Sequence, residues 1–181
     1  MSHPASDEPV ETVWHGKYLV ARTRGTWEFV SRAGGIRAAV ILAIDAGDVI
    51  LVEQFRVPLG RNCLELPAGL VGDVEAGESV EESARRELEE ETGYRAERIE
   101  NLGAFYSSPG MASESFTLVR ASGLTKVGDG GGDHDEDIVV HRVPLVEIEA
   151  FVAAKRAEGL GIDVKLLVLL AGAILGPVGS P

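Results

Sequence analysis

The segment GDVEAGESVEESARRELEEETGY, residues 72–94, is rich in acidic residues and has a glycine at or next to each of its ends. Within it, Ser79 and Glu82 have the spacing of a capping box, in which each side chain accepts a hydrogen bond from the other residue's backbone N–H. Gly93 stands where a helix commonly ends, because glycine adopts the left-handed conformation without strain. We therefore predict an α-helix over residues 80–92.

The acidic residues of this helix are not confined to its polar side. At about 100° per residue, Val80, Ala84 and Leu88 define the core-facing direction. Glu87 and Glu91 fall among or beside them. Like charges one turn apart repel each other, and partial burial increases the cost. A cation bound between the two carboxylates would remove the conflict.

The remaining charges of the helix are expected elsewhere. Glu90 flanks Glu87, and Glu82, Arg86 and Glu89 are predicted on the solvent-facing side. A charged run most often marks a solvated helix face, and helix geometry by itself leaves that alternative open.

Composition limits the class of protein. The chain has 181 residues with 17 Lys and Arg against 29 Asp and Glu, a formal charge of −12. The length suits one domain with a sizeable core. The acid excess argues against nucleic-acid binding, which usually needs a basic face, and favours a hard divalent cation such as Mg²⁺ or Mn²⁺. The single cysteine, Cys63, excludes an intramolecular disulfide framework and is expected to act as a small apolar residue.

Neither end of the sequence predicts a membrane anchor. Residues 1–12 lack the apolar segment of a signal peptide and are expected to form a disordered tail. The apolar residues 164–175 are far fewer than the roughly 20 needed to span a bilayer. We predict a buried C-terminal helix there, capped by Asp163, and a cytoplasmic protein without membrane partners.

Short β-prone runs and helical periods predict a mixed α/β fold. A hairpin turn is expected at residues 45–48 and a second helix at 145–158. The expected strands cover residues 17–23, 26–32, 36–44, 49–55, 97–106, 115–121 and 137–143. We divide the chain into the tail, N-terminal strands at 13–38 as a dimerisation element, and a main domain at 39–181.

Residues 72–94 resemble the Nudix box: glycine, five residues, glutamate, seven residues, Arg-Glu, an aliphatic residue, any residue, Glu-Glu, any residue, glycine and an apolar residue. Every fixed position is filled, by Gly72, Glu78, Arg86, Glu87, Leu88, Glu90, Glu91, Gly93 and Tyr94. The resemblance implies the Nudix fold, an α/β/α sandwich around a mixed β-sheet, here with an N-terminal antiparallel strand subdomain. It also implies metal-dependent hydrolysis of a nucleoside diphosphate linked to another group.

The same resemblance implies roles for the box residues. Glu87 and Glu91 correspond to the principal ligands of two to three Mg²⁺ or Mn²⁺ ions, with Glu90 assisting the metal site and the catalysis. Arg86, which we place with the catalytic residues, is expected to pair with Glu78 and hold the loop on the helix. Metal ions bridging the diphosphate would neutralise its charge and lower the pKa of an attacking water.

Residues 51–71, LVEQFRVPLGRNCLELPAGLV, resemble the segment that precedes the box in ADP-ribose pyrophosphatases and related nucleotide-sugar hydrolases. The resemblance implies that the Ala68 carbonyl binds one metal ion and that Arg56 and Glu65 contact substrate. One departure is a three-residue insertion between Gly69 and Glu78, which could displace the Ala68 carbonyl.

Further features favour ADP-ribose as the substrate. Pro109 lies 15 residues after Tyr94, the spacing found in the ADP-ribose-hydrolysing branch, and we include Pro109 and Met111 among the substrate-binding residues. The branch also takes its catalytic base from an acidic loop after the box. Here that loop follows three glycines, and Glu136 is the predicted base, with Asp133 and Asp135 as alternatives.

Trp27 and Phe29 share one face of an expected strand and are candidates for stacking on adenine, although core aromatics are commoner. In relatives the N-terminal strands help to build the partner subunit's adenine pocket, so the resemblance implies a homodimer. The leading interpretation is hydrolysis of ADP-ribose, or a close ADP-sugar, to AMP and a sugar phosphate. The alternatives are hydrolysis of GDP-mannose or another nucleotide sugar, and a non-catalytic module that senses ADP-ribose.

Overall fold

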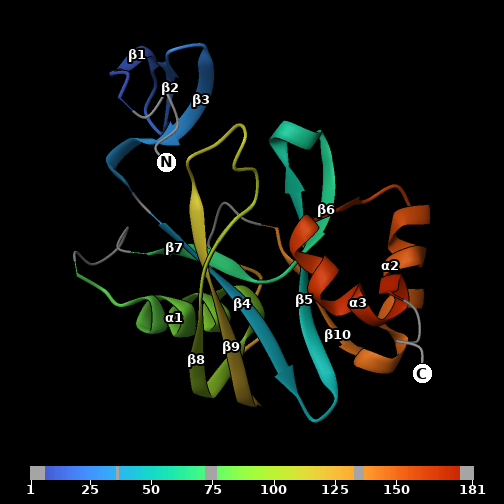
Figure 1. The fold of residues 1–181 in the computed structure, drawn as a ribbon. Helices are drawn as coiled ribbons and strands as arrows, with labels where there is room; N and C mark the ends of the chain where they lie inside the picture. The colour runs from blue at the N-terminus through green and yellow to red at the C-terminus, as the bar shows by residue number, and fades with distance from the viewer. Residues whose placement is uncertain (1–6, 36, 72–76, 133–136, 176–181) are drawn as a thin grey trace, which may run out of the picture.

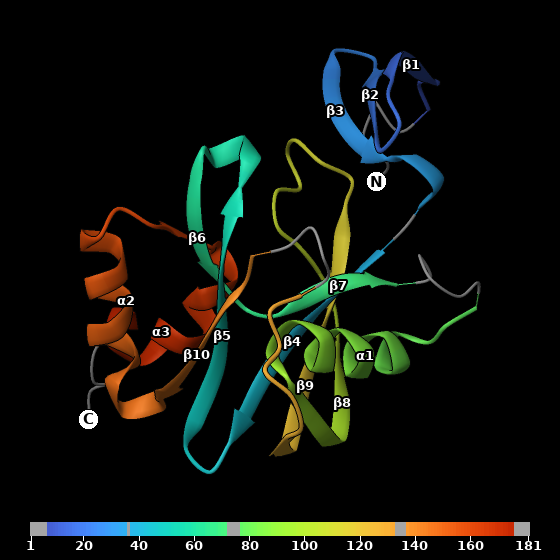
Figure 2. The same cartoon turned by 180° about the vertical axis from the view of Figure 1, so that it is seen from behind.

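The computed structural model describes residues 7–35, 37–71, 77–132 and 137–175. Two β-sheets and three α-helices make up this part of the chain (Figure 1, and from behind in Figure 2). The elements follow in the order β1 (Val10–His15), β2 (Leu19–Arg24), β3 (Trp27–Arg32), β4 (Arg37–Asp45), β5 (Asp48–Arg56), β6 (Arg61–Glu65), β7 (Ala68–Val71), α1 (Val80–Thr92), β8 (Tyr94–Tyr106), β9 (Ser115–Lys126), β10 (Val139–Pro144), α2 (Ile148–Ala157), β11 (Gly161–Ile162) and α3 (Leu167–Leu175).

The larger sheet has the strand order β11-β6-β5-β4-β9-β8, with β10 paired to β5 and β7 paired to β4. The pairs β4–β9 and β11–β6 are parallel and the other pairs of this sheet are antiparallel, so the sheet is mixed, as predicted. The strands β1, β2 and β3 form a separate antiparallel sheet, which Figure 1 shows at the N-terminal end of the molecule.

Alternate residues of β4 enter two different cores. Val40 and Leu42 pack in the cluster that contains residues of α2 and α3, whereas Ile41 packs with Ala84 and Leu88 of α1. Successive side chains of a strand point to opposite faces, so a continuous apolar run such as β4 needs cover on both. Helix α1 lies on one side of the sheet and α2 and α3 on the other (Figure 1), which confirms the α/β/α sandwich.

The turn between β4 and β5 determines where the sheet opens. Ala46 and Gly47 both have positive φ, 50° and 87°, the pattern of a type I′ hairpin turn, so the predicted turn is confirmed. The two strands pair at Ile44–Val49 and Asp45–Asp48, next to the turn. Further from the turn β4 pairs with β7 and β9, and β5 pairs with β6 and β10. The divergence of β4 and β5 opens a space between two halves of the sheet.

The N-terminal boundaries differ from the prediction. Strand β1 begins at Val10 and pairs with β2, so the expected tail of residues 1–12 is wrong for its last three residues. Residues 1–6 lie outside the described part. Strand β4 begins at Arg37, and the boundary expected between residues 38 and 39 therefore falls inside a strand. The strands β1, β6, β7 and β11 were not predicted.

The three predicted helices form, but one is less buried than expected. The last helix begins as a 3-10 turn, Val164–Leu166, whose N-cap Asp163 accepts a hydrogen bond from the Lys165 N–H. Leu166 and Leu170 are buried, whereas much of the apolar face of α3 is exposed, including Ile174. The prediction of a buried helix is wrong for that face. Among the described residues, no helix is long and apolar enough to span a membrane.

Candidate active site

A cavity of about 480 Å³ opens where β4 and β5 diverge. Its lining includes carboxylates, guanidinium groups and apolar side chains of β4, β7 and β9. The structure brings together seven residues that the sequence singled out: Arg56, Glu65, Ala68, Arg86, Glu87, Glu90 and Glu91.

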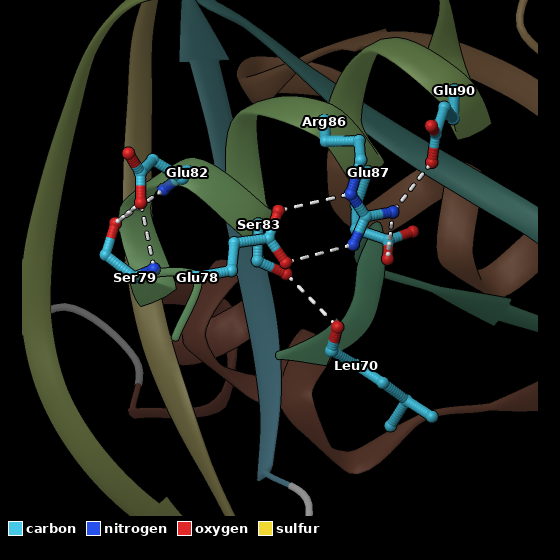
Figure 3. Close-up of polar contacts among 8 residues, drawn as sticks. All are labelled: Leu70, Glu78, Ser79, Glu82, Ser83, Arg86, Glu87 and Glu90. Atoms are coloured by element: carbon cyan, nitrogen blue, oxygen red, sulfur yellow. Dashed lines mark hydrogen bonds and ion pairs between the residues drawn. The ribbon is translucent and has the colours of Figure 1, made fainter. Parts of the chain in front are cut away.

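Helix α1 carries four of these seven residues and is fixed at its ends and against β7. The Ser79 Oγ accepts a hydrogen bond from the Glu82 N–H (3.2 Å), and the Glu82 carboxylate accepts one from the Ser79 N–H (2.9 Å), which confirms the capping box (Figure 3). Gly93 ends the helix in the left-handed conformation, with φ of 69°. The Ser83 hydroxyl donates to the Leu70 carbonyl of β7 at 3.2 Å. These contacts hold the acidic face of α1 at the edge of the cavity.

Arg86 lies at the centre of a group of carboxylates (Figure 3). Its Nε is 3.2 Å from Oε1 of Glu78, and its Nη1 is 2.9 Å from both Oε1 of Glu87 and Oε2 of Glu90. Burial opposes the charge of the guanidinium, but the hydrogen bond with Glu78 and the charge of Glu87 raise the pKa of Arg86 above its ordinary value. The expected pair with Glu78 is confirmed. The prediction that Arg86 faces solvent is wrong, because these carboxylates draw it inward and leave its side chain 24% exposed.

Glu87 and Glu91 lie against the β7 backbone. Glu91 is buried and accepts a hydrogen bond from the Ala68 N–H at 3.0 Å, and the Glu87 side chain is 13% exposed. A Cβ at Gly69 would lie 1.9 Å from Cδ of Glu87, so this position has no room for a side chain. The helix angles therefore correctly predicted that these two glutamates turn toward the protein interior.

These groups fit a divalent metal ion by their chemistry. Glu87 and Glu91 offer oxygen donors one helical turn apart, beside backbone that only a glycine can bring so close. Across the described ranges, no three His, Cys, Asp or Glu side chains are already gathered as a metal cluster. In this arrangement Arg86 neutralises Glu87 and Glu90, and Ala68 donates to Glu91. Bound ions would replace part of these contacts.

Arg56 and Glu65 meet across the β5–β6 pair. The Arg56 Nε lies 2.6 Å from Oε1 of Glu65, and its Nη2 lies 2.8 Å from Oε2. The hydrogen bond with Glu65 raises the pKa of Arg56, so its charge is secure at the cavity wall. The sequence predicted both residues at the site but not their bond to each other.

Besides Ala38, Val40, Gly69 and Leu70, sequence reasoning missed six cavity residues: Arg32, Gln54, Ser107, Glu114, Phe116 and Lys165. Arg32 and Glu114 form an ion pair at 2.5 Å between the end of β3 and the start of β9. Lys165 donates to Asp163 at 2.7 Å and lies 5.8 Å from the centre of the Phe116 ring. Glu114 stands three residues after Met111, which is a sequence signal that could have identified it. No pattern in the sequence indicated Lys165.

A family model for the NUDIX domain matches residues 35–161. The chain belongs to the Nudix family. The match contains α1 and most of the cavity wall, while Arg32 and Lys165 lie outside it.

Nudix relatives cover much of the chain. An ADP-ribose pyrophosphatase of Bacillus subtilis is 40% identical over 129 residues, which are 71% of this chain and 67% of the relative. A GDP-mannose pyrophosphatase of Pectobacterium atrosepticum is 38% identical over 137 residues, again 71% and 67%. A solved structure described as an ADP compounds hydrolase superposes with a TM-score of 0.69 at 25% identity, covering 94% of each chain.

Four residues predicted to bind substrate do not line the Nudix cavity of this chain: Trp27, Phe29, Pro109 and Met111. Trp27 and Met111 are largely exposed, at 52% and 61%. The Met111 carbonyl accepts a hydrogen bond from the Val30 N–H at 2.9 Å, which attaches the loop of Pro109 to β3. The contact of these four residues with substrate stays a prediction.

The predicted base of the Nudix reaction, Glu136, lies outside the described residues, as do its alternatives Asp133 and Asp135. The chain leading to them is held at the end of α1, where the Gly131 N–H donates to the Glu91 carbonyl at 2.9 Å. The role of this acidic loop stays a prediction.

Proposed function

We propose that this Nudix hydrolase uses divalent metal ions to split the diphosphate of ADP-ribose, or of a close ADP-sugar, into AMP and a sugar phosphate. The observation that carries the proposal is the position of Glu87 and Glu91 against the Ala68–Gly69 backbone. Both glutamates line a cavity that also presents the guanidinium of Arg56. Acidic metal ligands and a fixed cation at one cavity are what a diphosphate substrate requires.

The metal ions proposed are two to three Mg²⁺ or Mn²⁺. Glu87 and Glu91 would hold them, with Glu90 and the Ala68 carbonyl as further ligands. When bound, such ions neutralise the diphosphate and lower the pKa of an attacking water.

The residues of the chain position the substrate and its ligands. Arg56 is proposed to bind a phosphate oxygen, and Glu65 orients Arg56 through two hydrogen bonds. Arg86 ties Glu78 to α1 and holds Glu87 and Glu90 in place. This arrangement needs no arginine-rich cradle, which agrees with a chain of charge −12.

We favour an adenine nucleotide as the substrate because the chain is 40% identical to an ADP-ribose pyrophosphatase of B. subtilis. GDP-mannose is the second candidate, because a GDP-mannose pyrophosphatase is 38% identical over a similar share of the chain. We further propose a homodimer, in which exposed residues of the N-terminal sheet such as Trp27 approach the partner's site.

The test is hydrolysis of ADP-ribose in Mg²⁺ by the parent chain and by Glu91→Gln, with the AMP formed measured by chromatography. We expect turnover by the parent and a loss of about 100-fold or more in Glu91→Gln, because a metal ligand supplies several kcal/mol of transition-state stabilisation. Glu89→Gln is the matched control: Glu89 is on the same helix but pairs with Arg95 at the surface.

The other outcomes separate the alternatives. Faster turnover of GDP-mannose than of ADP-ribose would replace the substrate and keep the mechanism. Tight binding of ADP-ribose without hydrolysis, by a folded parent chain, would contradict the enzyme and support a sensing module. Equal losses in Glu91→Gln and Glu89→Gln would contradict the metal site.

A further inference from the structure

Gln54 brings a primary amide to the wall of the cavity. The residue is 8% exposed and lines the cavity. Its side chain makes no hydrogen bond to any residue of the described ranges, although a primary amide can donate two and accept two. In the described part of the chain, the buried side-chain atoms without a partner are Nε of Arg22 and Nε of Arg24, so the Gln54 amide reaches the open cavity. A ligand in the cavity can therefore hydrogen-bond it.

The strand pattern explains why Gln54 faces inward. Gln54 and Arg56 are two residues apart on β5 and therefore share a face of the strand. Directly opposite Gln54 on β6 is Cys63, a weak hydrogen-bonding group whose Sγ lies 3.9 Å from the Leu64 carbonyl. The backbone thus directs the amide toward the Arg56 side of the sheet and gives it no strong neighbour there.

The amide differs in charge from the groups around it. Arg56, Glu65 and Lys165 on this wall are each paired with an opposite charge, as is the Arg32–Glu114 pair at the rim. A neutral amide adds little to the binding of a diphosphate, but it matches a hydroxyl group, which also donates and accepts. Ala38, Val40 and Leu70 also line the cavity and offer apolar surface that suits the carbon face of a sugar ring.

We propose that Gln54 is a specificity residue that hydrogen-bonds a hydroxyl of the substrate's sugar beyond the diphosphate. The inference rests on the proposed function and deepens it. Gln54 selects substrates whose second phosphate carries a hydroxyl-rich sugar, and the metal site and Arg56 act on the diphosphate whatever is attached to it.

The test compares ADP-ribose with the methyl ester of ADP, which has the same diphosphate and no sugar on the second phosphate. The variant is Gln54→Met, which keeps the length of the side chain and removes its hydrogen bonds. We expect kcat/KM for ADP-ribose to fall by about tenfold or more, mainly through KM, because a site built to bind a hydroxyl loses that bond. For the methyl ester we expect a change of less than about twofold.

Asn62→Leu is the matched control. Asn62 is an exposed amide on β6 that donates to Glu53 at 3.0 Å and does not line the cavity. Its removal leaves the ratio of the two kcat/KM values unchanged.

Two other kinetic results would overturn the assignment of Gln54. Equal losses of Gln54→Met on both substrates would make Gln54 a structural residue of the wall, and no loss on ADP-ribose would remove it from the site. Calorimetric binding of ADP-ribose keeps the test independent of turnover: we expect the Kd of Gln54→Met to be about tenfold higher. A parent chain that binds and does not hydrolyse ADP-ribose would refute the proposed function and leave this binding test in force.

Discussion

The Arg56 guanidinium makes two parallel hydrogen bonds to the Glu65 carboxylate, at 2.6 and 2.8 Å, across neighbouring strands. The Glu65 side chain is 6% exposed and the Arg56 side chain 41%. The buried acid therefore fixes the orientation of a cation that lies half in the cavity. Two parallel bonds hold a planar guanidinium in a way that the ammonium of lysine cannot reproduce.

Arg56→Lys is expected to lower kcat/KM for ADP-ribose by about 10–100-fold although the charge is retained, because a positioned phosphate contact is lost. Steady-state kinetics measure the effect, and Arg98→Lys, at an exposed arginine outside the cavity, is the control. Full activity in Arg56→Lys would mean that charge without orientation is sufficient.

Gly69→Ala is expected to reduce activity by about 100-fold or more while the chain stays folded. The new Cβ would lie 1.9 Å from Cδ of Glu87 and must displace this carboxylate from the β7 backbone. Gly172→Ala is the control, because a Cβ there meets no atom within 4 Å. Activity assays with circular dichroism test the prediction, and an active Gly69→Ala enzyme would show that the position of Glu87 is not essential.

Ser79→Ala is expected to destabilise the chain by about 1 kcal/mol, because the Glu82 N–H loses its hydrogen-bond acceptor at the start of α1. Threonine also serves as an N-cap residue and keeps the hydroxyl that donates to Glu82, so Ser79→Thr should retain most of the stability. Urea unfolding of the three chains measures the difference. Identical unfolding midpoints for parent and Ser79→Ala would contradict a stabilising role of the cap.

Glu53 makes stability depend on pH. Burial opposes its charge, but hydrogen bonds from Asn62, Lys155 and His141 bring the pKa of Glu53 below its ordinary 4.5. A lowered carboxyl pKa stabilises the fold above the unfolded-state value, and this contribution disappears as the pH falls through the folded-state value.

Glu53→Gln should therefore be less stable than the parent by about 1–3 kcal/mol at neutral pH. The difference should shrink once the pH falls below 4.5. Urea unfolding over a series of pH values tests this expectation. A difference that persists unchanged in acid would assign the effect to the shape of the side chain and not to its charge.

Cys63 is expected to be inert. It is 4% exposed, and burial together with the nearby Glu65 charge raises the pKa of its thiol to about 12. Iodoacetamide should react about 100-fold or more slowly with the native chain than with the urea-unfolded chain, since the thiolate is the reactive form. Cys63→Ser should keep most of the activity. Rapid native labelling, or loss of turnover in a folded Cys63→Ser chain, would contradict this view.

Local sequence determined the parts of the site that lie within one helix or one turn. The spacing of Ser79, Glu82 and Gly93 correctly predicted the bounds of α1, and the helical period turned Glu87 and Glu91 inward. Such features depend on interactions over three or four residues, so a single segment contains the information.

Tertiary structure decided which segments meet. Arg86 falls on the polar side of the isolated helix, yet the structure draws it inward because Glu78, Glu87 and Glu90 surround it. The expectation of a buried α3 was wrong because apolar composition does not reveal how much of a helix face finds cover, and Ile174 remains 61% exposed.

The cavity itself shows the same division. Arg32, Gln54 and Lys165 come from β3, β5 and the 3-10 turn before α3, and their approach depends on strand pairing and on the divergence of β4 from β5. The sequence alone determined helix α1 with its acidic face, and it identified the Nudix box and the segment of residues 51–71 that precedes it. Only the packing of distant strands decided which cations and amides face the acidic side of α1 across the cavity. Those contacts join residues that no local sequence period relates.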